Sequence, residues 1–225
     1  MINAARLLAD LQPQLRKLDA DLRQQIKDEP ELKARLDEEY KQARAHKRTA
    51  STYNDWQDGE ITQAAVAWLL SCVFLRFCED NELLPEPLLA SPANDQHAAN
   101  VLPREAQRAY VRANPLNNER DWLLHGFAEL AKSPAIAGLF SAEHNPLYRL
   151  PISAYAAKDL IDFWQAIDPA TGALEHDFAD AERNTRFLGD LYQDLSEAAR
   201  KRYALLQTPD FVEEFILDRT LTPAI

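Results

Sequence analysis

Four cations that lie close together are the residues of this sequence best suited to binding chemistry. Lys41, Arg44, Lys47 and Arg48 fall within eight residues of one another. Lysine and arginine side chains pair with the phosphates of nucleic acid and release its condensed counterions. Cations are also favourable at the carboxyl end of a helix, where the helix dipole is negative. The four residues are therefore a candidate DNA-binding cluster, with helix-terminal charge as the alternative.

Two short motifs contain residue types that act on nucleic acid, but neither has the surroundings that such chemistry needs. The segment 145–148, Asn-Pro-Leu-Tyr, is close to the Asn-Pro-Pro-Tyr loop that holds a flipped adenine. Leucine replaces the second proline, and no buried strand precedes it. Glu31 and Lys33 match half of a metal-dependent nuclease site, yet Pro30 places them in the first turn of a helix. We interpret both motifs as local structure and predict no catalytic residue in this chain.

The glycines argue against a nucleotide or cofactor loop in this sequence. Such a loop lies between a strand and a helix and needs glycines close together, so that backbone amides can approach the ligand. The chain has five glycines, and no two of them lie within ten residues of each other. A cofactor is therefore not expected to bind this chain alone.

Histidine and cysteine spacing gives no metal site. The five histidines are scattered, and no Cys-x2-Cys or His-x3-His pair occurs. Cys72 and Cys78 lie in one apolar segment, which predicts buried thiols in a reducing cytosol rather than a disulfide framework. We predict no bound metal.

Composition sets the broad class of protein. The 225 residues allow one or two domains, and the formal net charge is -11. Residues 1–50 hold eleven Lys/Arg against nine Asp/Glu, about +2, which leaves about -13 for the remainder. If DNA is touched, the amino-terminal part is the better candidate. No signal peptide is evident, and the longest apolar run, 64–75, is short for a bilayer, so we expect a cytoplasmic protein without membrane contact.

Apolar periodicity predicts an all-α fold that begins with a helical hairpin over residues 1–50. Its first helix has leucines spaced three and four residues apart, at positions 8, 11, 15, 18 and 22. Pro30 suits the first turn of a second helix. We expect this seam to pack within its own chain, and pairing with a second copy is the alternative.

A second domain, residues 51–185, is predicted to be an orthogonal helical domain around a buried central helix. Residues 64–77 are apolar all round, which indicates a helix in the core. The segment 49–60 that precedes them is predicted to be a polar connection. Further helices are expected over 104–112, 121–132 and 154–167, the last capped by Ser153.

Residues 186–225 are predicted to be a connector and a lead-in helix to an α/β core that this chain lacks. Helices are expected over 180–195, 197–206 and 209–221. Thr208 is a suitable N-cap for the last of these, and Pro209 fits its first position.

Several segments together resemble the PglX family of adenine-specific DNA methyltransferases. They are Ala-Ala-Val-Ala-Trp at 64–68, Phe-Cys-Glu-Asp-Asn at 77–81, His-Asn-Pro-Leu-Tyr-Arg-Leu-Pro at 144–151, and the closing segment from Phe187. The resemblance is to the amino-terminal part of these enzymes from phage growth limitation and bacteriophage-exclusion (BREX) systems, and to the type 2 branch most of all. The adenine methyltransferase of DISARM defence is a close second.

The resemblance implies that the parent enzyme transfers a methyl group from S-adenosylmethionine to adenine in double-stranded DNA. In that family the Thr-Pro helix forms one wall of the cofactor pocket, which implies cofactor contacts for Thr208 and Gln207. Relatives carry an aromatic residue before Thr-Pro, where this chain has Leu206-Gln207. The chain is expected to be an inactive fragment alone, a helical scaffold that contacts DNA or other defence subunits. The alternative is a stand-alone acidic helical interaction module without enzymatic activity.

Overall fold

The chain folds into helices and connecting loops, as the sequence predicts. The computed structural model describes residues 3–94, 96–134, 136–180 and 186–195. Its elements are α1 (Ala4–Asp28), α2 (Pro30–Ala45), α3 (Tyr53–Asp80), α4 (Val101–Ala113), α5 (Glu119–Ala131), the short 3-10 helices η1 (Ala137–Phe140) and η2 (Pro146–Tyr148), α6 (Ala154–Trp164) and α7 (Arg186–Leu195). Within these residues the only β pairing is an isolated bridge between Ile167 and Leu174. The all-α prediction is therefore confirmed.

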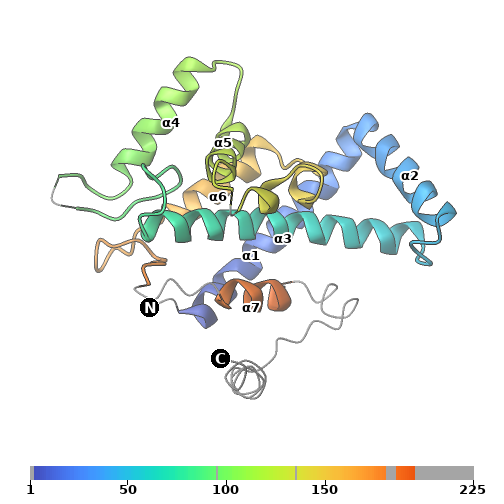
Figure 1. Cartoon of the computed structure of the whole chain (residues 1–225), viewed down its shortest axis with the longest axis horizontal. Helices are drawn as coiled ribbons and strands as arrows, with labels where there is room; N and C mark the ends of the chain where they lie inside the picture. Colours follow the sequence, from blue (N-terminus) through green and yellow to red (C-terminus); the bar gives the residue numbers. More distant parts are fainter. Residues whose placement is uncertain (1–2, 95, 135, 181–185, 196–225) are drawn as a thin grey trace, which may run out of the picture.

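The central helix α3 organises the fold. It crosses the molecule, with α1 running obliquely across it, α5 and α6 beside it and α7 on the opposite side (Figure 1). Trp68, Leu69 and Cys72 are among its side chains that are at most 1% exposed. Burial on all sides is what a helix without a polar face requires. The predicted central helix is confirmed.

The predicted polar connection over 49–60 is wrong in its second half. Helix α3 begins at Tyr53, because the Thr52 hydroxyl caps it by accepting a hydrogen bond from the amide of Asp55 at 3.2 Å. Trp56 is only 9% exposed, so these first turns contribute an apolar side chain as well. A good N-cap and one aromatic anchor therefore outweigh the polar composition of the segment.

Helix α3 is long and apolar enough to cross a membrane by length and composition. Its most apolar 18-residue window is, however, 72% buried within the protein. Since helices α1, α5 and α7 and the 3-10 helix η2 pack against it, α3 has the surroundings of a core helix.

The leucine seam of α1 packs within the chain. Leu7, Leu11, Leu18 and Leu22 are buried, and Leu8 and Leu15 are partly buried against them. Helix α1 contacts α2, α3, α6 and α7, so the seam joins the common core. Pro30 occupies the first turn of α2, as predicted. The division into a hairpin of 1–50, a domain of 51–185 and a connector of 186–225 stays a prediction.

A buried ion cluster fixes the carboxyl end of α3. Arg76 has no exposed surface, and it donates to Glu79 at 2.9 Å and to both carboxylate oxygens of Asp80 at 2.7 Å. Burial raises the pKa of Glu79 and of Asp80, and the positive charge of Arg76 opposes that rise. The two carboxylates are therefore tolerated in the core because the Arg76 guanidinium pairs with both of them.

The same cluster ties two distant loops to α3. Glu79 accepts hydrogen bonds from the amides of Leu88, Leu89 and Ala90 at 2.5 to 3.2 Å, and Arg76 donates to the carbonyl oxygen of Ala90 at 2.7 Å. Asp80 accepts from the amide of Phe178 at 2.9 Å. The loop after α3 and the segment after α6 are thus held by side chains of one helical turn.

Replacement of Arg76 is expected to be strongly destabilising. Arg76→Met keeps much of the side-chain volume but leaves Glu79 and Asp80 buried without a counter-charge, which costs about 3–5 kcal/mol of unfolding free energy. Urea denaturation followed by circular dichroism measures this. The control is Arg23→Met, because Arg23 pairs with Asp19 and Asp58 on the surface and should cost at most about 1 kcal/mol. Equal losses in the two variants would contradict the role given to the cluster.

Candidate nucleic-acid interface

The four predicted DNA-binding residues lie together at the carboxyl end of α2. Lys41 and Arg44 are on its last turns, and Lys47 and Arg48 follow directly, all four exposed. Lys47 has a left-handed backbone (φ 56°), and the amide of Arg48 donates to the carbonyl oxygen of Ala43 at 2.8 Å. This is the usual way in which a helix end is closed and its chain turned. We call these four residues the basic turn.

The basic turn is poor in carboxylates and largely free of ion pairs. Residues 40–54 contain no Asp or Glu. Lys41 lies 3.9 Å from Glu38, and in the described part of the chain Arg44, Lys47 and Arg48 have no ion pair. Such cations can pair with phosphates without first giving up a carboxylate partner. Favourable placement at the helix dipole explains Lys41 and Arg44 equally well.

An aromatic cluster holds the basic turn in place. The ring of Tyr40 on α2 lies 5.3 Å from that of Tyr53 and 5.5 Å from that of Trp56, both on α3. The Tyr40 hydroxyl donates to the carbonyl oxygen of Ser51 at 2.8 Å, across the base of the turn. Burial, and a hydrogen bond to Asp37, raise the pKa of Tyr53 to about 12. These aromatic residues are therefore structural supports rather than surfaces for stacking bases.

Arg149 is a further part of this region that sequence reasoning did not single out as a site residue. It donates to Glu60 on α3 and to Glu39 on α2, both at 2.5 Å, and its carbonyl oxygen accepts a hydrogen bond from Arg35. Burial lowers the pKa of Arg149, but the two carboxylates raise it by more. Its partners lie 89 and 110 residues away in sequence, so no local pattern could have identified them.

A cavity of about 450 Å³ lies between the basic turn and Arg149. Arg48, Thr49 and Gln42 line it together with the carboxylates Glu39, Glu60 and Glu143, and with Arg149 itself. The mixture of charges nearly balances there, which does not favour a polyanion inside the cavity. We therefore place the binding capacity on the exposed rim, where the cations of the basic turn lie.

The segment 145–148 is a turn, as interpreted from the sequence. It forms η2, where the Asn145 side chain accepts from the amide of Leu147 at 3.1 Å and donates to the carbonyl oxygen of Leu139 at 2.8 Å. Leu147 is 1% exposed. Both polar atoms of Asn145 are thus used inside the protein, and the motif is not presented to a base. Glu31 and Lys33 lie in the first turn of α2, also as interpreted.

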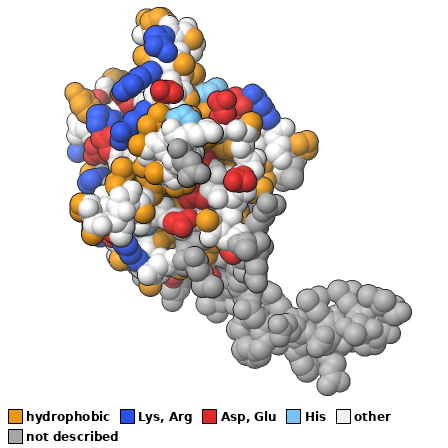
Figure 2. All heavy atoms as spheres, turned by 90° about the vertical axis from the view of Figure 1, so that its left-hand side faces the viewer, with side chains coloured by type: hydrophobic (Ala, Val, Ile, Leu, Met, Phe, Trp, Pro, Cys, Tyr) orange, Lys and Arg blue, Asp and Glu red, His pale blue; other side chains and the backbone are white. Residues whose placement is uncertain are grey.

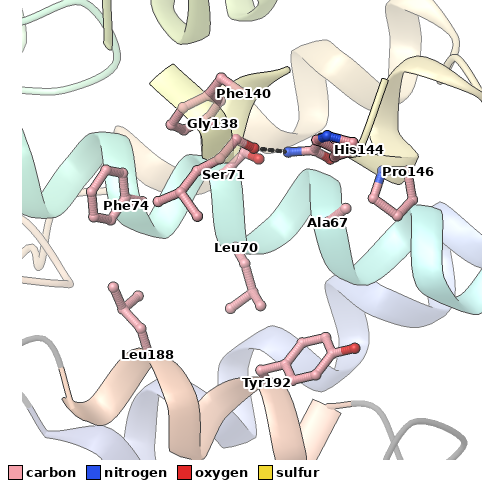
Figure 3. Close-up of a pocket in the computed structure, with 12 residues that line it drawn as sticks. Ala67, Leu70, Ser71, Phe74, Gly138, Phe140, His144, Pro146, Leu188 and Tyr192 are labelled. Carbon is pink, nitrogen blue, oxygen red and sulfur yellow. Dashed lines mark hydrogen bonds between the residues drawn. The ribbon is translucent and has the colours of Figure 1, made fainter. Parts of the chain in front are cut away.

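An apolar groove of about 370 Å³ lies between α3, α7 and the segment that contains η1. Figure 3 shows Leu70 and Phe74 of α3 on one side and Leu188 and Tyr192 of α7 on the other. Leu139, on the rim, is 59% exposed. Its lining is mostly apolar and includes the polar residues Ser71, His144 and Asn145, and it has the chemistry of a protein contact.

Reactive groups are few in the described part of the chain. Its residues contain no group of three or more His, Cys, Asp or Glu side chains placed to hold a metal ion. Cys72 and Cys78 are buried free thiols, as predicted. Burial raises the pKa of Cys72 well above its usual range and that of Cys78 to about 11. Such thiols are protonated at neutral pH and are poor nucleophiles.

Neither cysteine is expected to react with iodoacetamide in the folded protein at pH 8. Both should be alkylated at once in urea, because unfolding returns each thiol to water and to its ordinary pKa. Intact-mass spectrometry after a timed quench measures the difference. Rapid labelling of Cys72 in the native protein would contradict its burial, which is complete.

The predicted cofactor contacts, Gln207 and Thr208, lie outside the described residues, as do the predicted helices 197–206 and 209–221. The helix expected over 180–195 is observed as α7, Arg186–Leu195. The helices expected over 104–112, 121–132 and 154–167 are observed as α4, α5 and α6, with Ser153 capping α6 through the amide of Ala156 at 3.0 Å.

Comparison with known proteins gives one strong match. The chain is 51% identical, over 232 aligned residues and its whole length, to "Adenine-specific methyltransferase PglX" of Streptomyces coelicolor. It spans only 19% of that relative's length. No family model matches the chain, and no solved structure matches it.

Proposed function

We infer that this chain, which belongs to the PglX family, is a helical scaffold within a DNA methyltransferase that marks adenine. The observation that carries this proposal is the 51% identity along the whole chain to a protein named as an adenine-specific methyltransferase. Identity at that level without a gap in coverage supports a common fold and a common place in the parent enzyme. The family was expected from the sequence, and that prediction is confirmed.

The proposed parent reaction is transfer of a methyl group from S-adenosylmethionine to the N6 atom of adenine in a short DNA site. Host marking of this kind would let a BREX-type defence system recognise unmarked phage DNA. The protein is proposed to work in the cytoplasm, with double-stranded DNA as ligand and other defence subunits as possible partners. No role at a membrane is proposed.

The cofactor has no fitting site among the described residues. Backbone amides that cradle S-adenosylmethionine need closely spaced glycines in a loop between a strand and a helix. The described residues contain no such strand and no closely spaced glycines. We propose that Gln207 and Thr208 reach the cofactor only when a methyltransferase core is present. The chain by itself is therefore proposed to be inactive.

Incubation of the purified chain with S-adenosylmethionine and adenine-containing plasmid DNA is expected to give no N6-methyladenine. Mass spectrometry of the digested DNA measures the product directly. Methylation above the level of a heat-denatured control would overturn the proposal that the chain alone lacks the catalytic machinery.

The basic turn is the proposed DNA contact of this scaffold. Arg44, Lys47 and Arg48 support it, because among the described residues they have no ion pair to give up when they pair with phosphates, whereas Lys41 lies 3.9 Å from Glu38. In a chain of net charge -11, DNA can be held only where such cations are gathered.

Arg44→Gln/Arg48→Gln is expected to weaken binding of a fluorescent 30-base-pair duplex and to lower the salt slope of log K by about two. Each lost phosphate contact removes about 0.9 from that slope. Arg16→Gln/Lys17→Gln on α1 is the matched control, since it removes the same charge from another exposed site. Identical slopes for the two double variants would overturn the proposed contact.

A second function, docking of another protein, is favoured by the apolar groove beside α7. It suits the alternative of a stand-alone acidic interaction module. The two functions differ in what they require. An interaction module would bind its partner through the groove without a methyltransferase core, whereas the scaffold would act only as part of the whole enzyme.

A further inference from the structure

We propose that α4 is a second DNA contact, in which Arg108 and Arg112 pair with phosphates of the duplex. The proposal rests on the proposed function, since it takes duplex DNA as the ligand. It concerns a different helix from the basic turn, at the other end of α3 (Figure 1). The supporting observations are the spacing and pairing of its arginines and the way in which the helix is held.

Arginines form a stripe along α4. Arg104, Arg108 and Arg112 are exposed and lie four residues apart, so successive ones are about 6 Å apart along the helix axis. At about 100° per residue, Arg108 and Arg112 lie about 140° and 180° around the helix from Pro103, its one buried residue. Glu105 is the only acidic residue over 101–118. The stripe therefore presents positive charge away from the body of the protein.

The arginines of the described residues divide sharply by partner. Arg6, Arg23, Arg35, Arg76 and Arg149 all pair with carboxylates. Among the arginines whose side chains the structure describes, five have no acceptor, namely Arg16 on α1, Arg44 and Arg48 in the basic turn, and Arg108 and Arg112 on α4. In a protein with 36 Asp and Glu residues, two such arginines on one face are free to pair with an anion from outside.

The root of α4 is fixed by a buried hydrogen-bond network. Asn100, which has no exposed surface, donates to the carbonyl oxygen of Gln165 at 2.9 Å and accepts from the amide of Ser91 at 3.1 Å. Its left-handed backbone (φ 62°) turns the chain into the helix. Arg104 donates through Nε to the Gln165 side chain at 2.9 Å, so the first cation of the stripe also anchors it.

The far end of α4 is fixed by aromatic stacking on α5. The ring of Tyr110 lies 4.8 Å from that of His125 and 5.3 Å from that of Trp122. The Tyr110 hydroxyl accepts a hydrogen bond from Asn117 at 2.7 Å. Both ends of the helix are thus held, and α4 projects from the body with its arginine stripe pre-organised.

The projecting shape of α4 supports the same ligand as its positive charge. Figure 1 shows α4 rising from one end of the molecule, and Figure 2 shows Lys and Arg side chains gathered over this raised end. An isolated helix with exposed sides fits against the duplex or into its major groove, which is about 12 Å wide. A protein partner is the competing occupant, because Leu116 at the tip is 97% exposed. Glu105 is the only carboxylate over 101–118, and neither Arg108 nor Arg112 forms an ion pair within the described part of the chain, which favours the polyanion.

The test measures binding of the 225-residue chain to a fluorescent 30-base-pair duplex between 50 and 200 mM salt. Arg108→Gln/Arg112→Gln is expected to lower the salt slope by about two and the affinity at 100 mM salt by at least about tenfold. Arg108→Lys/Arg112→Lys should keep most of the affinity, since charge is retained. Both side chains are exposed, so melting temperatures should match the wild type.

Several outcomes would overturn the proposal. A wild-type salt slope in Arg108→Gln/Arg112→Gln, equal to that of the control Arg16→Gln/Lys17→Gln, would do so, and so would unchanged affinity at 100 mM salt. If Arg44→Gln/Arg48→Gln lowers the slope and the α4 variant does not, the proposed function stands and this inference fails. If the α4 variant lowers the slope and Arg44→Gln/Arg48→Gln does not, the contact at α4 is supported and the proposed contact at the basic turn is overturned.

Discussion

The fold depends on one buried ion cluster, Arg76 with Glu79 and Asp80. Three charges within one and a half turns of α3 have at most 5% of their side-chain surface exposed. Desolvation makes such an arrangement costly unless every charge finds partners. Here the partners include backbone groups of two loops, so the hydrogen bonds that compensate the buried charges form only when the two loops become ordered. The cluster thus links a helix that could form locally to segments about ten and about one hundred residues away.

Specificity is the clearest consequence of this cluster. An apolar core around α3 would tolerate many positions of the loops, because burial of apolar surface has no direction. Hydrogen bonds from Glu79 and Asp80 select one position, and Asn81 adds a bond from its side chain to the carbonyl oxygen of Phe178 at 2.8 Å. The Phe-Cys-Glu-Asp-Asn segment that carries the family resemblance is therefore a structural device. Its distinctive sequence reflects a buried polar network and no chemistry of its own.

The long central helix also separates the proposed contacts with DNA. The basic turn follows α2 and is held against the amino end of α3 by aromatic residues, whereas α4 rises near the carboxyl end of α3 (Figure 1). Both places are built alike: arginines without carboxylate partners among the described residues stand on a backbone fixed by side chains beneath them. An acidic protein can hold a polyanion in this way, because the positive charge is local and the remaining charge lies elsewhere.

Local chemistry was predictable from the sequence by itself: the all-α class, the buried α3, the seam of α1, the cap at Ser153 and the turn at Asn145. Each follows from apolar spacing or from one capping side chain within a few residues. The start of α3 at Tyr53 was missed although its cap, Thr52, is a local signal, and the aromatic support from Tyr40 on α2 could not be read locally. The roles of Arg76 and Arg149, and the lack of a carboxylate partner at Arg108 among the described residues, were decided only by the tertiary structure. An arginine is the same residue whether it is buried, bridging or exposed, and only the fold brings carboxylates to some arginines and leaves others without them.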